Sequence, residues 1–152
     1  MTYARAAFWI KRSSIILILT GLIVAMVAHP ATDILMVFIA DILFWPFDGA
    51  QSFDAPESRL LAAISGGVMI GWGVAFWIIA DEGFVQAPEL SRRIILSSVW
   101  VWFVCDSTAS LLAGAPLNAV CNLFYLAIFA VPLYKIGVKV GIADDRSDQN
   151  TA

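Results

Sequence analysis

The sequence is poor in charge and in the side chains that bind metals. Charged residues make up 14% of its 152 residues, against about 25% in soluble domains. It has one histidine, His29, and two cysteines, Cys105 and Cys121, which lie in apolar stretches without Cys-x-x-Cys spacing. The usual zinc sites, and a haem held by two histidines of one chain, are therefore excluded. A net charge of −3 also argues against a nucleic-acid partner, which calls for clustered basic residues.

Catalytic motifs are also missing. The sequence has no nucleophile elbow, no phosphate-binding glycine loop and no histidine cluster. One acidic set could support metal-assisted chemistry on a lipid, but a solvated acidic face is the simpler interpretation. Its members are Asp33, Asp41, Asp48, Asp54 and Glu57. We expect no catalytic residue and no metal site.

No cofactor is required by this sequence, although a quinone or a pigment is compatible with it. Trp72, Trp100 and Trp102 lie well inside apolar stretches and could stack on such a molecule. Tryptophan that faces lipid or packs inside the protein is the favoured alternative.

Apolar residues dominate instead, at 61% of the chain. They form four long spans, at about 8–28, 60–80, 94–114 and 118–136. Spans of about 20 apolar residues cross a membrane as helices. We therefore predict an all-α polytopic membrane protein with a bundle of four transmembrane helices. Residues 1–142 form its single membrane domain, and residues 143–152 form a polar, flexible tail.

A shorter apolar run at about 33–45 is too short to cross the membrane. We predict an interfacial helix on the outer side, with Asp33, Asp41 and Asp48 on its water-facing side because they share one helical face. Phe38, Ile42 and Trp45 would face lipid or protein. A re-entrant half-helix is the alternative.

Basic residues predict the orientation. Eight lie on the side of the two chain ends and the loop between the second and third spans, and only Arg59 lies on the other side. The eight are Arg5, Lys11, Arg12, Arg92, Arg93, Lys135, Lys139 and Arg146. By the positive-inside rule both termini are cytoplasmic. We expect the first span to be a retained anchor, because the residues before Ala28 make a poor signal-peptidase site.

Asp106 is the only charged residue inside the third span. Intramembrane carboxylates are costly and usually face a protein interior or a water-filled cavity. If the third and fourth spans form a hairpin about residues 115–116, Tyr125 comes level with Asp106 and Asn122 level with Ser110. Asn118 shares the face of Asn122. This polar seam predicts either a proton, cation or quinone site or hydrogen bonds that hold the two helices together, and we favour the second.

Arg59 is the second candidate for a ligand-binding group. It could reach Asp106 from the second span. We favour surface pairing with Glu57, Asp54 or the other carboxylates of the outer loop.

The second span carries small residues at every fourth position, namely Ala63, Gly67, Gly71 and Ala75. Such spacing lets helix backbones approach closely, which drives helix association in lipid. The stripe predicts helix packing, and we favour packing inside this bundle over packing against another copy or subunit.

Residues Arg59–Gly73, with the sequence RLLAAISGGVMIGWG, combine an arginine with a glycine-rich apolar helix. This stretch resembles the corresponding helix of small four-helix bacterial inner-membrane proteins, loosely DoxX-like. Some members of that group are linked to quinone redox chemistry. No further motif aligns with them, so the resemblance implies only the four-helix architecture and a location in a bacterial inner membrane.

The hypothesis favoured by these features is a non-enzymatic accessory or scaffold subunit. It would contact membrane lipids and pack against other membrane proteins or its own copies. The alternative is a membrane protein that handles a small ligand at the seam around Asp106.

Overall fold

The computed structural model describes residues 1–136, and all of its regular elements are helices. Four of them are long and apolar enough to cross a membrane. The predicted all-α, four-helix membrane architecture is therefore confirmed for the described part of the chain. The polar tail expected at residues 143–152 lies outside it.

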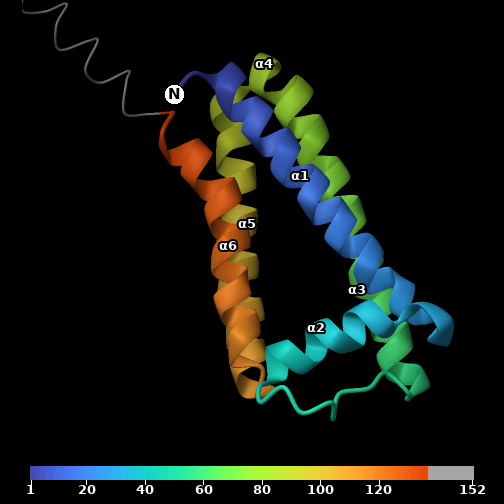
Figure 1. The fold of residues 1–152 in the computed structure, drawn as a ribbon. Coiled ribbons are helices and arrows are strands. Elements are labelled where there is room, and N and C mark those ends of the chain that lie inside the picture. The colour runs from blue at the N-terminus through green and yellow to red at the C-terminus, as the bar shows by residue number, and fades with distance from the viewer. Residues whose placement is uncertain (137–152) are drawn as a thin grey trace, which may run out of the picture.

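The first pair of helices joins α1 (Tyr3–Ala25) to α3 (Pro56–Ile78), which run side by side along most of their length (Figure 1). A short 3-10 turn, η1 (Met26–Ala28), extends α1. Proline at the first helical position starts α3, where its fixed φ suits the helix and its missing N–H would have no partner.

The second pair is a hairpin of α5 (Pro88–Leu112) and α6 (Pro116–Tyr134). Gly114, with φ of 79°, makes the turn between them, a conformation that favours glycine. The hairpin forms where the sequence predicts it, so residues of α5 and α6 at equal distances from the turn lie level with each other.

The two pairs lie together at one end and diverge toward the other (Figure 1). At the divergent end, η2 (Pro30–Thr32) leads into α2 (Ile34–Phe44), which runs across from the first pair and contacts α6. We call this the α2 end. Its 11-residue helix is the short one expected from the sequence.

The side of α2 that was predicted to face water is partly buried in the structure. Asp41 does not face water, because it is only 4% exposed. The loop after α2 folds back over it, and the backbone N–H of Gly49 donates to both carboxylate oxygens at 2.9 and 3.1 Å. Phe38 and Ile42 are exposed, as a lipid-facing side requires.

At the opposite end, the helical path of α3 continues beyond Asp81, where the sequence suggested an end. It passes through a π-helical turn, η3 (Ile79–Gly83), into α4 (Phe84–Gln86). We call this the α4 end. There Lys11 pairs with Asp81 at 2.7 Å, which connects α1 to η3.

The core lies where the two pairs meet. Phe76 of α3 and Phe129 of α6 are 1% and 2% exposed, and their rings meet edge to face with centroids 5.2 Å apart. Trp72 of α3 lies against Trp102 of α5, with centroids 5.9 Å apart. These two aromatic contacts hold the pairs together, so Trp72 and Trp102 serve packing.

Candidate functional site

Asp106 lies in a polar cluster between α5 and α6. Its Oδ2 accepts hydrogen bonds from the side-chain amides of Asn122 at 2.6 Å and Asn118 at 3.1 Å. Asn118 also donates to Ser110 Oγ at 2.7 Å, and Asn122 lies 3.2 Å from Ser107 Oγ. The structure thus brings together Asp106, Ser110, Asn118 and Asn122, as the hairpin register predicted.

The cluster lies near the hairpin turn. Six residues separate Asp106 from Leu112, the end of α5, which places it about 9 Å along the helix from that end. Asn122 is 4% exposed, and Asp106 is half-buried. Its Oδ1 accepts no hydrogen bond from the described residues. Two amide donors on one carboxylate oxygen hold α5 and α6 in a fixed register.

Tyr125 does not belong to this cluster. Its hydroxyl forms a short hydrogen bond with Thr20 of α1, and its ring lies against Trp102. A tyrosine hydroxyl in an apolar setting needs a polar partner, and at this depth the partner comes from α1. Tyr125 therefore links the hairpin to the first pair.

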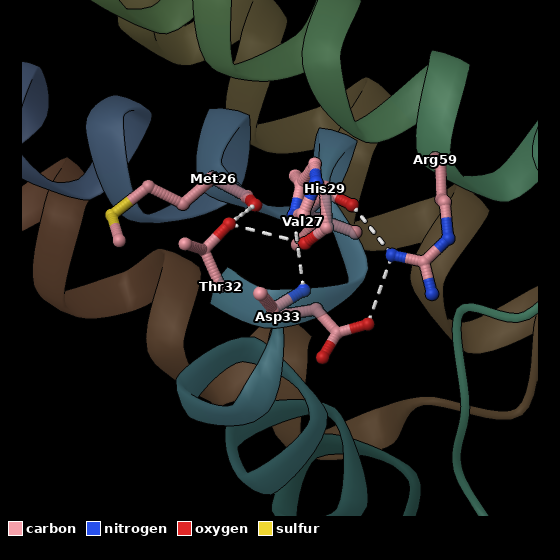
Figure 2. Close-up of polar contacts among 7 residues, drawn as sticks. Met26, Val27, His29, Thr32, Asp33 and Arg59 are labelled. Atoms are coloured by element: carbon pink, nitrogen blue, oxygen red, sulfur yellow. Dashed lines mark hydrogen bonds and ion pairs between the residues drawn. The ribbon is translucent and has the colours of Figure 1, made fainter.

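Arg59 lies at the α2 end, on α3, and it does not contact Asp106. One guanidinium nitrogen, Nη1, lies 2.9 Å from Asp33 Oδ2 and donates to the carbonyl oxygen of Val27 at 2.9 Å (Figure 2). The side chains of Arg59 and Asp33 are only 15% and 17% exposed. The pairing is with a carboxylate of the outer loop, as favoured from the sequence, but it is more enclosed than a surface pair.

The surrounding turn is held by local hydrogen bonds. Thr32 Oγ1 donates to the carbonyl oxygens of Met26 and His29, and His29 Nδ1 accepts from the backbone N–H of Ala31 at 3.1 Å (Figure 2). His29 thereby caps the start of η2. These bonds give the arginine pair and the histidine a structural role at the junction of α1, α2 and α3.

The predicted small-residue stripe faces away from α1. A Cβ added at Gly67 or Gly71 would meet no atom within 4 Å. Ala75 is exposed, and Ala63 is half-buried. The interpretation that this stripe packs inside the bundle is therefore wrong for Gly67 and Gly71.

Other glycines make the close contact inside the first pair. A Cβ at Gly66 would lie 2.5 Å from the carbonyl oxygen of Gly21, and one at Gly73 would lie 3.1 Å from that of Ser14. Gly66 and Gly73 are seven residues apart, and so are Ser14 and Gly21. This equal seven-residue spacing on α1 and α3 is the sequence pattern that predicts the close contact, and the four-residue stripe does not.

A groove between α1 and α6 was not predicted. Its α1 side is formed by Arg5, Trp9, Arg12 and Ile16. Arg5 and Arg12 contributed to the predicted orientation, and no role was predicted for Trp9 or Ile16. The four residues are four, three and four positions apart, which places them on one helical face. That pattern is the signal by which the groove could have been found.

Within residues 1–136, no group of three or more histidine, cysteine, aspartate or glutamate side chains could hold a metal ion. No protein-family model, curated protein or solved structure matches this chain. Any assignment of function therefore depends on the geometry described above.

Proposed function

We propose that this chain is a non-enzymatic membrane subunit that associates with other membrane proteins or with its own copies. The observation that supports it is the exposed face of α3 that carries Gly67, Gly71 and Ala75. Nothing in the described chain covers this face. It is also flanked by large apolar side chains, with Ile64 and Val68 53% and 65% exposed.

The burial of the four spans supports the same proposal. Only 17% of the most apolar window of α3 is buried within the chain, against 33% for α1. Glycine in a helix interior costs up to about 1 kcal/mol relative to alanine, so two exposed glycines on one face weaken α3 without any compensating contact in this chain. A helix docked on that face would supply the contact, because small residues allow close backbone approach.

The polar cluster of the hairpin fits a subunit without chemistry of its own. Asp106 is bonded to Asn118 and Asn122 of the facing helix, and every buried side-chain nitrogen or oxygen among the described residues has a hydrogen-bond partner. Hydrogen bonds of this kind stabilise helix pairs in lipid by about 0.6 kcal/mol on average. These hydrogen bonds favour a structural role for the Asp106 carboxylate, which is to hold α5 and α6 together.

The proposal includes the membrane and the orientation. The count of basic residues supports cytoplasmic ends, with the α2 end on the outer side. The resemblance of Arg59–Gly73 to DoxX-like helices is part of the same proposal and supports the four-helix architecture and a bacterial inner membrane.

Native mass spectrometry of protein extracted gently from its own membranes tests the association. We expect a stoichiometric assembly that is lost in Gly71→Leu, because the leucine fills the approach surface. Ser65→Leu adds a side chain of the same size to an exposed position on another side of α3 and should leave the assembly intact. A monomer in both detergent and native membranes, or an assembly that survives Gly71→Leu, would contradict the proposal.

A second candidate function is supported by the unbonded oxygen of Asp106. Oδ1 accepts nothing from the described residues and is free to bind a proton, a cation or a quinone hydroxyl. Carboxyl infrared difference spectra with and without an added quinone test this function. An Asp106→Asn variant that binds the quinone as the natural chain does would remove the candidate.

A further inference from the structure

The groove between α1 and α6 differs in chemistry from the rest of the bundle surface. It has a volume of about 790 Å³, within the range of roughly 300–1,000 Å³ that small-molecule sites occupy. Basic groups line one part of it, and apolar side chains line the other. None of the described residues that line it is acidic. They are Met1, Arg5, Trp9, Arg12, Ser13, Ile16, Ala127, Ile128, Val131, Pro132 and Lys135.

The basic part lies at the end where α1 begins and α6 ends. The backbone nitrogen of Met1 donates to the carbonyl oxygen of Lys135 at 2.7 Å, which holds the start of α1 beside the end of α6 at the mouth. Arg5 and Lys135 are exposed beside it and form no ion pair with a described residue. Several positive charges that line a groove, with no acidic side chain among the described residues that line it, form a site for an anion.

Arg12 lies deeper along α1 but directs its charge back toward the mouth. Seven residues separate it from Arg5, which is about 10 Å of helix. Its guanidinium carbon lies 4.3 Å from the ring centroid of Phe8, one turn nearer the start of α1. A long basic side chain in a membrane helix takes this course to keep its charge at the interface. The basic groups are thus concentrated at one level.

The deeper part of the groove is apolar. It runs between Trp9 and Ile16 of α1 and Ala127 and Val131 of α6. Arg5 and Ile16 are eleven residues apart, so the groove follows α1 for about 16 Å. On its floor the carbonyl oxygen of Ile128 accepts a hydrogen bond from the Ser13 hydroxyl at 3.0 Å.

We propose that this groove binds an anionic phospholipid of the surrounding bilayer. The headgroup phosphate lies among Arg5, Arg12 and Lys135, and an acyl chain lies between Trp9, Ile16 and Val131. The choice of a lipid follows from the combination of a positive mouth with a long apolar channel that begins at the interface. This site is separate from the exposed face of α3 and does not depend on the proposed association.

Trp9 supplies a direct readout, because it lines the groove and its side chain is 46% exposed. The full chain is placed in phosphatidylcholine vesicles, and acyl-brominated phosphatidylglycerol or acyl-brominated phosphatidylcholine is added. We expect stronger quenching of tryptophan fluorescence by the phosphatidylglycerol. The excess should vanish in Trp9→Phe, whose other tryptophans are still quenched by both lipids.

Charge variants distinguish a specific binding site from general electrostatic attraction of anionic lipid to the basic surface. Arg5→Gln with Arg12→Gln should lower the preference for brominated phosphatidylglycerol by roughly 25-fold, since each basic residue that lies near the headgroup contributes about a fivefold effect. Arg92→Gln with Arg93→Gln removes the same charge outside the groove and should leave the preference nearly unchanged.

Three outcomes overturn the proposal. The first is equal quenching by both lipids, and the second is equal loss of preference in the two double variants, which assigns the effect to the overall surface charge. The third is a preference that appears only when Asp144, Asp145 and Asp148 are replaced by Asn, which makes the chain's own acidic residues the occupant of the groove.

Discussion

The Ser13 hydroxyl lies 3.0 Å from the carbonyl oxygen of Ile128, the oxygen that Pro132 leaves without its usual helical donor. In a regular helix the N–H of residue 132 would bond to this oxygen, and proline has no N–H. The same hydroxyl lies 3.0 Å from the carbonyl oxygen of Trp9 on its own helix. Ser13 is 4% exposed, so a serine of α1 satisfies a buried acceptor of α6.

Ser13→Ala should lower the free energy of unfolding by about 1 kcal/mol, because a buried carbonyl loses its donor. Ser14→Ala is the matched control. Ser14 is fully buried too, but its hydroxyl bonds to Ile10 of its own helix. Denaturant unfolding in detergent measures both. A loss that is the same at both positions, or that persists in a Pro132→Ala background, would contradict this assignment.

Asn122→Ala should destabilise the hairpin by about 1 kcal/mol, because Asp106 loses its shorter hydrogen bond. A double-mutant cycle with Asp106→Ala should give a coupling energy of about 0.6–1.7 kcal/mol. Thr108→Ala removes an exposed hydroxyl on α5 and serves as the control. Additive effects of the Asp106 and Asn122 variants would show that the bond does not support the fold.

Gly66→Ala should lower the free energy of unfolding, and Gly67→Ala should raise it. The new methyl at residue 66 would lie 2.5 Å from backbone atoms of Gly21 and Ala25, so α1 and α3 would have to move apart. This separation should lower the free energy of unfolding by about 1–3 kcal/mol. At residue 67 the methyl meets nothing within 4 Å, so alanine should stabilise the isolated chain by up to about 1 kcal/mol through helix propensity. Thermal unfolding of both variants in the same detergent measures these changes in stability. Equal changes would contradict the placement of Gly66 against α1 and of Gly67 on the open face of α3.

Arg59→Ala should destabilise the α2 end more than Arg92→Ala destabilises the α4 end. Arg59 loses a half-buried pair with Asp33 and the hydrogen bond to Val27, together about 1–2 kcal/mol. The pair of Arg92 with Glu89 is exposed on the glutamate side, and such pairs contribute about 0–1 kcal/mol. Hydrogen exchange of α2 amides gives a second measurement, with faster exchange expected only in Arg59→Ala. Unchanged exchange there would contradict the role of Arg59 at this junction.

Much of the fold follows from the sequence because lipid imposes simple rules on helices. Apolar length predicts the four spans, and the short turn at Gly114 sets the register that brings Asn122 to Asp106. The same register places Tyr125 on the correct face but cannot predict its partner. That partner, Thr20, comes from a helix far away in the sequence, and only the packing of the two pairs brings it near.

The faces of α3 could not be chosen from composition. Gly67 and Gly71 have the spacing of a packing motif, and Gly66 and Gly73 lie on the same helix. The close approach occurs at Gly66 because Gly21 lies opposite, and such complementarity depends on both helices. Asp41 was misplaced for a related reason, since its burial depends on a loop that folds back to Gly49.

The longest and the shortest spans belong to different helix pairs, while α1 with η1 and α5 are nearly equal at 26 and 25 residues. The helical path through α3, η3 and α4 has 31 residues and α6 has 19, or about 46 Å and 28 Å. A hydrocarbon core is about 30 Å thick, and a helix that exceeds it fits by tilting. In Figure 1, α1 and α3 are inclined against α5 and α6. Bilayer thickness therefore acts unequally on the two pairs. A thicker bilayer draws the pair that holds the longest span upright, and α2, which runs between the pairs where they diverge, must follow that movement.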